Sequence, residues 1–406
     1  MFAAIRGLTG AVLVLLAAAA AWAKPAVLNV RLGVHPEGTR VVLDLSERPG
    51  YRVFTLADPY RVVIDLTEVD WKLPGGRPPS GTGLVEALRY GLFAVGTSRV
   101  VLDVKGPVRI RNVGVIPGTA DRPIRLVLDL AAVEATAFKK SQQAGPVLPA
   151  SVAAPAAPSA ASRLPPVKPP GPEARTRRII VIDPGHGGVD PGTVGLSGTT
   201  EKTITLVMAK ELKKQLEATG IYEVVLTRKR DIFLRLRDRT AIAHEAKAAL
   251  FLSLHADSHD STTLRGASVY TLSEQSSDEE AAALAAKENK ADLIAGIDLS
   301  RESEIVTNIL IDLAQRETMN LSARFAGILV GELGRTSVML PKPHRYAGFA
   351  VLKAPDVPSV LVELGYLSSA RDEALLRSAS YRVKLAGAIV GAIDDYFALQ
   401  ESLKKS

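Results

Sequence analysis

A proline- and alanine-rich segment near the middle of the chain divides it into two parts that must fold separately. The run QQAGPVLPASVAAPAAPSAASRLPPVKPPGPEART contains almost no large apolar side chains. It cannot bury a core, and such compositions form semi-extended tethers between domains. We assign residues 136–177 to this linker, with one domain before it at residues 24–135 and another after it at residues 178–400.

The first 23 residues have the pattern of an export signal. MFAAIRGLTGAVLVLLAAAAAWA combines one basic residue, an apolar run and the small-residue site Ala21-Trp22-Ala23, which is typical of a secretory signal peptide cut after Ala23. The alternative is a membrane anchor, but the apolar run is short for a bilayer span. No other segment is apolar enough to cross a membrane, so we expect an exported protein with no transmembrane segment in its mature form.

Cysteine content and charge narrow the possible chemistry and partners. The chain has no cysteine, so no thiolate is available as a nucleophile or a metal ligand. Residues 24–134 carry 15 basic and 12 acidic residues, residues 135–178 carry 7 and 1, and residues 179–406 carry 27 and 30. In an exported protein this basic front end favours an anionic envelope polymer or membrane surface as the partner. Nucleic acid is not expected, because no helix combines clustered lysine and arginine with a nucleic-acid motif.

Four copies of one short pattern predict that the first domain is all-β. RVVLDLS, RVVIDLT, RVVLDVK and RLVLDLA begin at Arg40, Arg61, Arg99 and Arg125. Each is a valine-, isoleucine- and leucine-rich run bounded by turn residues, as in buried strands. The pairing of similar halves predicts two antiparallel sheets packed face to face. The repeated arginine and aspartate form either cross-strand surface pairs or a polymer-binding face, and we expect a binding module.

Strands and helices alternate in the second domain. RIIVID, YEVVLTR, ALFLSLH and PSVLVEL are typical buried strands, and TITLVMAKELKKQLEATG is typical of a helix that ends at Gly220. This alternation predicts an α/β fold, with a mostly parallel sheet and helices on both faces. In such sheets ligands bind beyond the carboxyl ends of the strands.

Four ligand-capable side chains fall at that edge of the predicted sheet. His186 follows the first strand in IIVIDPGHGG, and Glu201 opens the next helix. His255 ends FLSLHAD, and Glu363 ends SVLVELG. Histidine and carboxylate ligands with one open position make up a catalytic zinc site. We assign His186, Glu201 and His255 to Zn²⁺, and Glu363 to a general base that takes a proton from the attacking water and returns it to the leaving amine. On spacing alone the two glutamates could exchange roles.

Other polar residues are candidates for the surroundings of this site. An acid behind the metal ligands should orient the histidines, and Asp183 or Asp257 is placed for that. His259 and His344 are weaker candidates for the lining of the cleft.

These motifs resemble a known family of cell-wall hydrolases. IDPGHGGVDPG, LTRKRDIFLRLRDR, LFLSLHAD and PSVLVELGYLSS are similar to the zinc-dependent N-acetylmuramoyl-L-alanine amidases of the amidase_3 family. TRVVLDLSE and VFTLADPYRVVIDL resemble the AMIN module found before such amidases. The order of signal, AMIN module, linker and amidase is similar to that of periplasmic cell-division amidases of Gram-negative bacteria.

The resemblance implies a substrate, a location and roles for the site residues. The substrate would be the amide between the lactyl group of N-acetylmuramic acid and L-alanine of the peptidoglycan stem peptide. Its hydrolysis would split the septal wall and separate daughter cells. His186, Glu201 and His255 fall on the zinc positions of the family, and Glu363 falls on its catalytic glutamate.

An acidic insert at residues 274–317 is not required by the α/β layout. It carries 11 acids and 4 bases. Ser277 and Glu280 have capping-box spacing, which predicts that a helix starts there. Glu288 lies within the apolar stripe of this helix, which comprises Ala281, Leu284, Ala291 and Ala295. Either the helix lies loosely on the surface with Glu288 in water, or it covers the cleft and Glu288 takes the open zinc position.

The resemblance favours the second arrangement. Division amidases of this type have such an inhibitory helix and LytM-type activator proteins, so it implies an autoinhibited enzyme with a partner of that kind. Two other functions stay open. The chain could be another zinc amide hydrolase on the same polymer, such as a peptidase or deacetylase, or a non-catalytic wall-binding protein that kept the fold. Only the amidase frees stem peptides that begin at L-alanine, and the presence of all four site residues argues against the binding protein.

Overall fold

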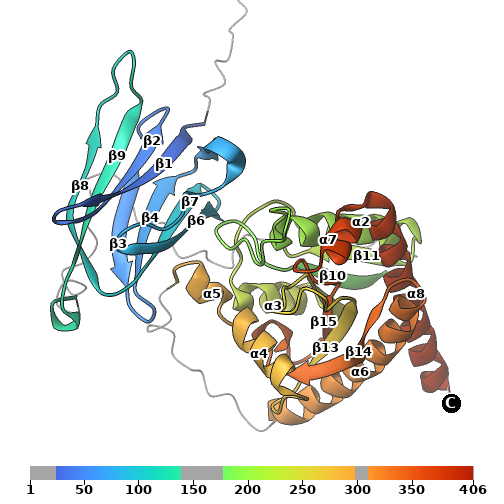
Figure 1. Cartoon of the computed structure of the whole chain (residues 1–406). Helices are drawn as coiled ribbons and strands as arrows, with labels where there is room; N and C mark the ends of the chain where they lie inside the picture. Colours follow the sequence, from blue (N-terminus) through green and yellow to red (C-terminus); the bar gives the residue numbers. More distant parts are fainter. Residues whose placement is uncertain (1–23, 139–176, 298–309, 406) are drawn as a thin grey trace, which may run out of the picture.

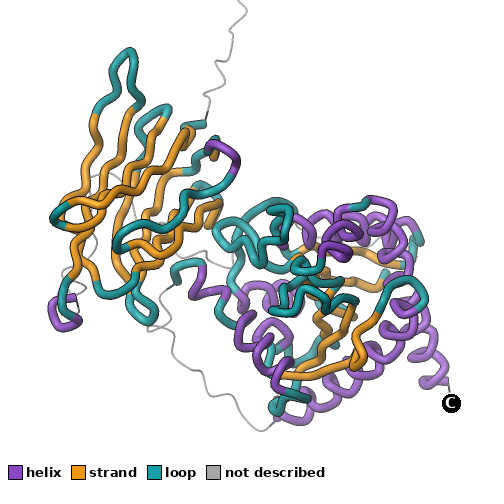
Figure 2. Tube along the Cα trace, viewed as in Figure 1, coloured by secondary structure: helices purple, strands orange, loops and turns teal. Residues whose placement is uncertain are grey.

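The computed structural model describes residues 24–138, 177–297 and 310–405 (Figure 1). The expected export signal, almost all of the expected linker and residues 298–309 of the acidic insert lie outside the described residues. Figure 2 shows one part built from strands and a second part in which helices surround a sheet. Among the helices of the described ranges, none is long and apolar enough to span a bilayer.

The first domain is a β-sandwich, as the repeated strand pattern predicts. Its strands are β1 (Ala26–His35), β2 (Gly38–Leu45), β3 (Tyr51–Leu56), β4 (Arg61–Thr67), β5 (Asp70–Trp71), β6 (Val85–Ala94), β7 (Thr97–Val104), β8 (Val108–Ile116) and β9 (Ile124–Ala132), with a 3-10 turn at Pro74–Gly76. They form a five-stranded sheet, β5-β1-β2-β9-β8, and a four-stranded sheet, β3-β4-β7-β6. Alternate side chains of both sheets share one apolar core.

The internal repeat forms the central strand pair of each sheet. In β2 and β9, Arg40 lies opposite Asp129, and in β4 and β7, Arg99 lies opposite Asp65. Both pairs are ion pairs at 2.6 Å. Arg40 with Asp129 is the expected surface pair, whereas Arg99 and Asp65 pair across the strands but are both buried.

The second domain contains one six-stranded sheet. Its strands are β10 (Arg178–Pro184), β11 (Tyr222–Leu226), β12 (Leu250–His255), β13 (Ala267–Leu272), β14 (Met339–Ala347) and β15 (Ser359–Glu363). The order is β11-β10-β12-β15-β13-β14, and every neighbouring pair is parallel except β13 with β15. The predicted mostly parallel α/β sheet is therefore confirmed.

Helices cover both faces of this sheet. They are α2 (Glu201–Ala218), α3 (Leu236–Glu245), α4 (Glu279–Glu288), α5 (Ala291–Ile294), α6 (Leu310–Gly334), α7 (Ala370–Arg377) and α8 (Ala379–Lys405), with a 3-10 turn η3 at Ala350–Leu352. Ile180 and Ile182 of β10 pack in a core with α2, α6 and α8. Val181, between them, packs with α3, α4 and η3. As expected, α2 ends just before Gly220, which has φ 72°.

Candidate active site

The loop after β10 carries the first histidine of the site in an unusual turn. β10 ends at Pro184, and His186 has φ 60°, a left-handed conformation that is uncommon outside glycine and is frequent at functional sites. A side-chain carbon on Gly185 would lie 2.5 Å from the ring of His255. Glycine is therefore required there, and it lets the rings of His186 and His255 approach to 5.0 Å between centroids.

Two buried arginines hold the backbone of this loop. Arg239 donates to the carbonyl oxygens of Pro184 and His186, both at 2.9 Å. Arg228 donates to the carbonyl oxygens of Pro184 and Gly185, also at 2.9 Å. Both arginines are 2% exposed, so these carbonyl groups replace the water that each guanidinium group has lost. Both arginines belong to the motif LTRKRDIFLRLRDR, although no role was expected for them from the sequence.

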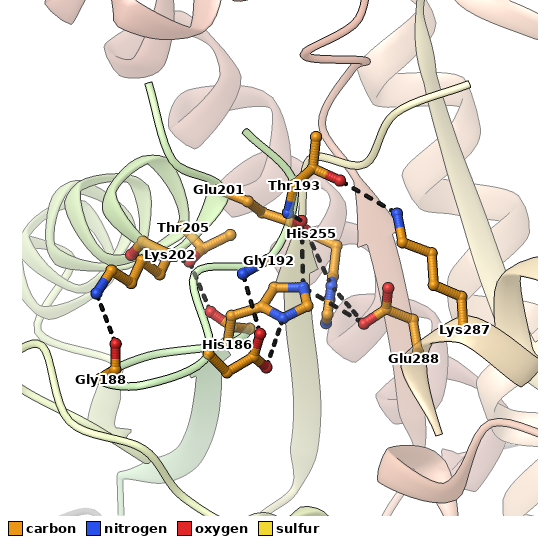
Figure 3. Close-up of polar contacts among 12 residues, drawn as sticks. His186, Gly188, Gly192, Thr193, Glu201, Lys202, Thr205, His255, Lys287 and Glu288 are labelled. Carbon is orange, nitrogen blue, oxygen red and sulfur yellow. Dashed lines mark hydrogen bonds and ion pairs between the residues drawn. The ribbon is translucent and has the colours of Figure 1, made fainter. Parts of the chain in front are cut away.

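Glu201, the first residue of α2, contacts both histidine rings through its carboxylate (Figure 3). Its Oε1 is 3.2 Å from Nδ1 of His255, and its Oε2 is 3.2 Å from Nε2 of His186. The N–H groups of Ala256 and Thr193 donate to the same two oxygens at 2.9 Å. Burial alone would raise the pKa of Glu201, but the charges and hydrogen bonds of the two histidines hold it well below its usual value.

A second carboxylate reaches the same point from the covering segment, which we define as residues 279–297. Glu288 is the last residue of α4. Its Oε2 lies 3.4 Å from Nε2 of His186 and 3.3 Å from Nδ1 of His255. Glu288 is only 5% exposed, and the apolar side chains of the same helix are buried with it. Two arrangements were expected for this helix. The described residues adopt the one in which the helix covers the cleft and Glu288 is buried.

The histidines and glutamates are spaced like the ligands of a tetrahedral metal ion. Neighbouring ligand atoms on zinc lie about 3.3 Å apart, because each bond is about 2.0–2.1 Å long. Glu288 contacts the two histidines through one oxygen at 3.4 and 3.3 Å, whereas Glu201 contacts each ring through a different oxygen at 3.2 Å. One ligand atom from each of His186, His255 and Glu288 lies within 4.8 Å of the others. Nε2 of His186 and Oε1 of Glu288 are buried without a hydrogen bond. The donor set and its unpaired atoms therefore fit a zinc ion.

The electrostatics of the cluster also favour a cation. Burial alone would lower the pKa of His186, but the carboxylates of Glu201, Asp190 and Glu288 raise it well above its usual value. The same carboxylates that favour a proton on the ring would favour a metal ion beside it.

The second nitrogen of each ring has its own partner. Oδ2 of Asp190 accepts the Nδ1 hydrogen of His186 at 2.9 Å. Nε2 of His255 lies 3.2 Å from the hydroxyl of Ser253, which donates to Asp183 at 2.8 Å. Asp183, one of the two acids expected to orient a histidine, therefore reaches His255 only through Ser253. Asp190, which was not expected from the sequence, is the aspartate in direct contact, and it follows His186 by four residues in PGHGGVDPG.

Asp257 contacts neither histidine ring, so the expectation that it orients one is wrong. Its carboxylate accepts the hydroxyl hydrogen of Thr193 at 2.8 Å and pairs with Lys287 of the covering segment. It lies two residues after the end of β12, and its side chain meets Lys287 of α4. Asp257 therefore anchors the covering segment beside the site.

Glu363 lies beside the cluster at the end of β15. It is the partner of His255 across β12 and β15, and its Oε2 accepts the N–H of Asp257 at 2.9 Å. Its Oε1 is buried without a hydrogen bond. Burial, followed by the charges of the neighbouring carboxylates, raises the pKa of Glu363 well above its usual value. A carboxyl group whose pKa is raised in this way is suited to proton transfer.

The helix that carries Glu288 starts one residue later than the capping-box prediction. Its N-cap is Asp278, whose Oδ1 accepts the N–H of Ala281 at 2.9 Å. Ser277 donates to Asp278 at 3.1 Å, and Glu280 pairs with Arg345 at 2.6 Å instead of reaching back. The predicted capping box is therefore wrong, because aspartate, an equally good acceptor, follows the serine.

Two other histidines were weaker candidates for the cleft. The ring of His259 packs edge-on against Tyr366 with 6.3 Å between centroids, and Nε2 of His344 lies 3.1 Å from the hydroxyl of Thr271. Neither is among the residues that line the cavity at the histidine cluster.

Comparison with known proteins agrees with this geometry. A family model described as N-acetylmuramoyl-L-alanine amidase matches residues 180–395, and one described as AMIN domain matches residues 29–130. N-acetylmuramoyl-L-alanine amidase AmiC of Escherichia coli O6:H1 is 33% identical over 381 residues, which cover 92% of this chain and 89% of that protein. The chain belongs to the N-acetylmuramoyl-L-alanine amidase family. The resemblance inferred from its motifs is confirmed.

Other relatives of this amidase cover different shares of the chain. N-acetylmuramoyl-L-alanine amidase AmiC of Neisseria meningitidis serogroup B is 33% identical over 366 residues, 88% of this chain and 86% of that protein. The solved catalytic domain of CwlV, an N-acetylmuramoyl-L-alanine amidase from Bacillus (Paenibacillus) polymyxa, is 28% identical with a TM-score of 0.39 and covers 54% of this chain and 98% of that one. The chain is an amidase with an AMIN domain before its catalytic domain.

Proposed function

We propose that this amidase uses Zn²⁺ to hydrolyse the amide between the lactyl group of N-acetylmuramic acid and L-alanine of the stem peptide. The observation that carries the proposal is the buried cluster of His186, Glu201 and His255 with Glu363 beside it. Both carboxylate oxygens of Glu201 lie 3.2 Å from a histidine nitrogen, whereas Glu363 contacts a backbone N–H. This difference supports Glu201 as the ligand and Glu363 as the base.

The chain's own residues then divide the work of hydrolysis. When bound, zinc polarises the scissile carbonyl and lowers the pKa of the attacking water. Glu363 takes a proton from that water and transfers it to the nitrogen of the leaving L-alanine. Asp190 holds the ring of His186, and Ser253 holds the ring of His255. Arg228 and Arg239 keep the loop between these groups rigid.

The covering segment would keep the enzyme inactive in its resting state. Glu288 would fill the fourth zinc position, and the pair of Lys287 with Asp257 would hold the segment beside Glu363. Substrate could then enter only after the segment withdraws. An activator, which we expect to be a LytM-type protein, would act by binding the open state more tightly than the closed one. Export by residues 1–23 would place the enzyme in the periplasm, where it would split septal peptidoglycan during daughter-cell separation.

The experiment that tests this function measures stem-peptide release from purified sacculi by the mature chain with zinc. Glu288→Ala should release more peptide than wild type without an activator, Glu363→Gln should release none, and a chelator should abolish release reversibly. Every released peptide should begin at L-alanine. Peptides cut within the stem, or free acetate, would instead identify a peptidase or a deacetylase. If none of the zinc-loaded variants releases peptide, the chain acts as a wall-binding protein instead.

A further inference from the structure

The β-sandwich contacts the covering segment through the outer face of its four-stranded sheet. Figure 1 shows α5 at the end of this segment nearest the sandwich. One apolar cluster joins Phe93 and Val101 of the sandwich, Val189 and Phe233 of the α/β domain, and Ala295 of the covering segment. The rings of Phe93 and Phe233 stack at 5.9 Å between centroids. Three parts of the chain that are far apart in sequence therefore meet at one interface.

Two buried arginines of the sandwich bind the carboxyl end of α5. Arg99 donates to the carbonyl oxygens of Ala295 and Gly296, both at 3.0 Å. Arg61 donates to the carbonyl oxygen of Leu293. Carbonyl groups in the last turn of a helix have no partner within it, and a buried guanidinium group needs acceptors for its hydrogens. The carbonyl oxygen of Leu293 also accepts the N–H of Gly296, and Arg61 has two further acceptors in its own turn. The interface thus supplies partners to the groups that remain on both sides.

The internal repeat shows that this use of arginine is particular to one sheet. Arg61 and Arg99 are only 2% and 4% exposed. Arg40 and Arg125 hold the same repeat position in the five-stranded sheet. Arg40 is exposed and binds its strand neighbour Asp129. Arg40 therefore makes a surface ion pair in one sheet, whereas in the other sheet Arg99 keeps a buried ion pair with Asp65 and also binds the covering segment.

We propose that the β-sandwich is a second restraint on the active site, because it holds α5 through Arg61 and Arg99 and so stabilises Glu288 in the histidine cluster. Leu293 follows Glu288 by five residues, so the segment cannot withdraw far while these hydrogen bonds persist. By linkage, a ligand that binds this sheet in place of α5 favours the open site. The inference rests on the proposed inhibition by Glu288, and its test must separate the two.

The first test removes the two arginines in the full-length chain. In Arg61→Ala/Arg99→Ala, Asp65 keeps a cation, because a neighbouring arginine also pairs with it at 2.7 Å. The sandwich core is therefore not left with an unpaired charge. Arg40→Ala/Arg125→Ala is the matched control, since it removes two arginines from the same repeat position on the other sheet.

A second variant changes the interface without touching an arginine. Val101→Asp places a carboxylate in the apolar cluster. The neighbouring residues Val100 and Leu102 belong to the core between the two sheets, whereas Val101 does not. The sandwich of this variant should therefore fold with the new carboxylate in water when it is undocked.

Amide hydrogen exchange in residues 289–297 is the direct readout, and stem-peptide release without an activator is the functional one. Losing one charge-assisted hydrogen bond corresponds to about a tenfold change in an equilibrium. Both interface variants should therefore exchange at least about tenfold faster than wild type, and their release should rise toward that of Glu288→Ala. The control should match wild type in both measurements.

The outcomes distinguish the two proposals. Unchanged exchange in both interface variants overturns the restraint, whatever Glu288→Ala does. Faster exchange with unchanged release, while Glu288→Ala is activated, also overturns it, because docking and inhibition are then uncoupled. If Glu288→Ala itself is no more active than wild type, the proposed inhibition fails and the regulatory role of the sandwich fails with it.

Discussion

Replacing Asp190 by alanine should weaken zinc binding although no zinc ligand is removed. Oδ2 of Asp190 accepts the Nδ1 hydrogen of His186 at 2.9 Å, and Oδ1 accepts the N–H of Gly192 at 3.0 Å. The first bond keeps the proton on Nδ1, so Nε2 presents its lone pair to the cluster. Asp190 is only 1% exposed, so bulk water does not reach this nitrogen in the native structure.

The size of the effect follows from this contact. Removing a partner that holds a metal-binding histidine typically weakens metal affinity about 10–100-fold, which corresponds to about 1.4–2.7 kcal/mol. Because Asp190 is buried and bonds the ring directly, we expect Asp190→Ala to fall in the upper half of this range. Asp190→Asn can keep an oxygen toward Nδ1 and should fall in the lower half.

Competition with a chromophoric chelator at neutral pH measures the dissociation constant for Zn²⁺. Asp129→Ala, which removes a surface ion pair of the β-sandwich, is the control and should bind zinc like wild type. Circular dichroism checks that each variant is folded. Wild-type affinity in a folded Asp190→Ala protein would falsify the reasoning, because the ring of His186 would then be held without its hydrogen bond.

The remaining predictions concern stability and the covering segment. Arg239→Met should lower the free energy of unfolding by about 3–5 kcal/mol, because it leaves the buried carboxylate of Asp183 without its cation; a denaturant midpoint equal to that of wild type would contradict this. Asp278→Ala should cost α4 about 1 kcal/mol by removing its N-cap, and unstimulated stem-peptide release should rise. Burial alone would raise the pKa of Asp278, but the N–H of Ala281 and a nearby arginine lower it. The stabilisation of α4 by the ionised carboxylate of Asp278 is therefore complete above about pH 4 and is lost as the pH falls through the lowered pKa. Amide exchange measured in the acid range should show this loss in wild type and not in Asp278→Ala. Zinc should slow amide exchange across α4 in wild type, and it should not change the exchange rate of α4 in Glu288→Ala.

The fold class could be predicted because most strands carry their burial pattern in their own residues. RIIVID, ALFLSLH and PSVLVEL became β10, β12 and β15, which are central and buried on both faces. β14 could not be recognised in this way. Its sequence, MLPKPHRYA, contains two prolines, which a strand tolerates here because β14 lies at the edge of the sheet.

The principal site residues could be predicted because the carboxyl ends of parallel strands meet at one edge. Asp190 could not, because its position depends on the turn that follows His186. Gly187 and Asp190 form an isolated bridge in which the N–H of Gly187 donates to the carbonyl of Asp190 at 2.9 Å. This bridge folds the chain back and brings the Asp190 carboxylate beneath the ring. Sequence spacing contains no signal for such a reversal beyond the glycines themselves.

The position of Glu288 depends on charges that no local pattern contains. A carboxylate within an apolar stripe can either remain exposed to solvent at the surface or be buried in a cleft that supplies a cation. Burial, together with the charges of Glu201 and Asp257, raises the pKa of Glu288, while His255 and His186 lower it. Closing the segment without a metal therefore gathers carboxylates that repel one another, and a divalent cation among them reverses this cost. Under the proposed function, zinc binding and closure should then stabilise each other, and the proposed activator would have to overcome both.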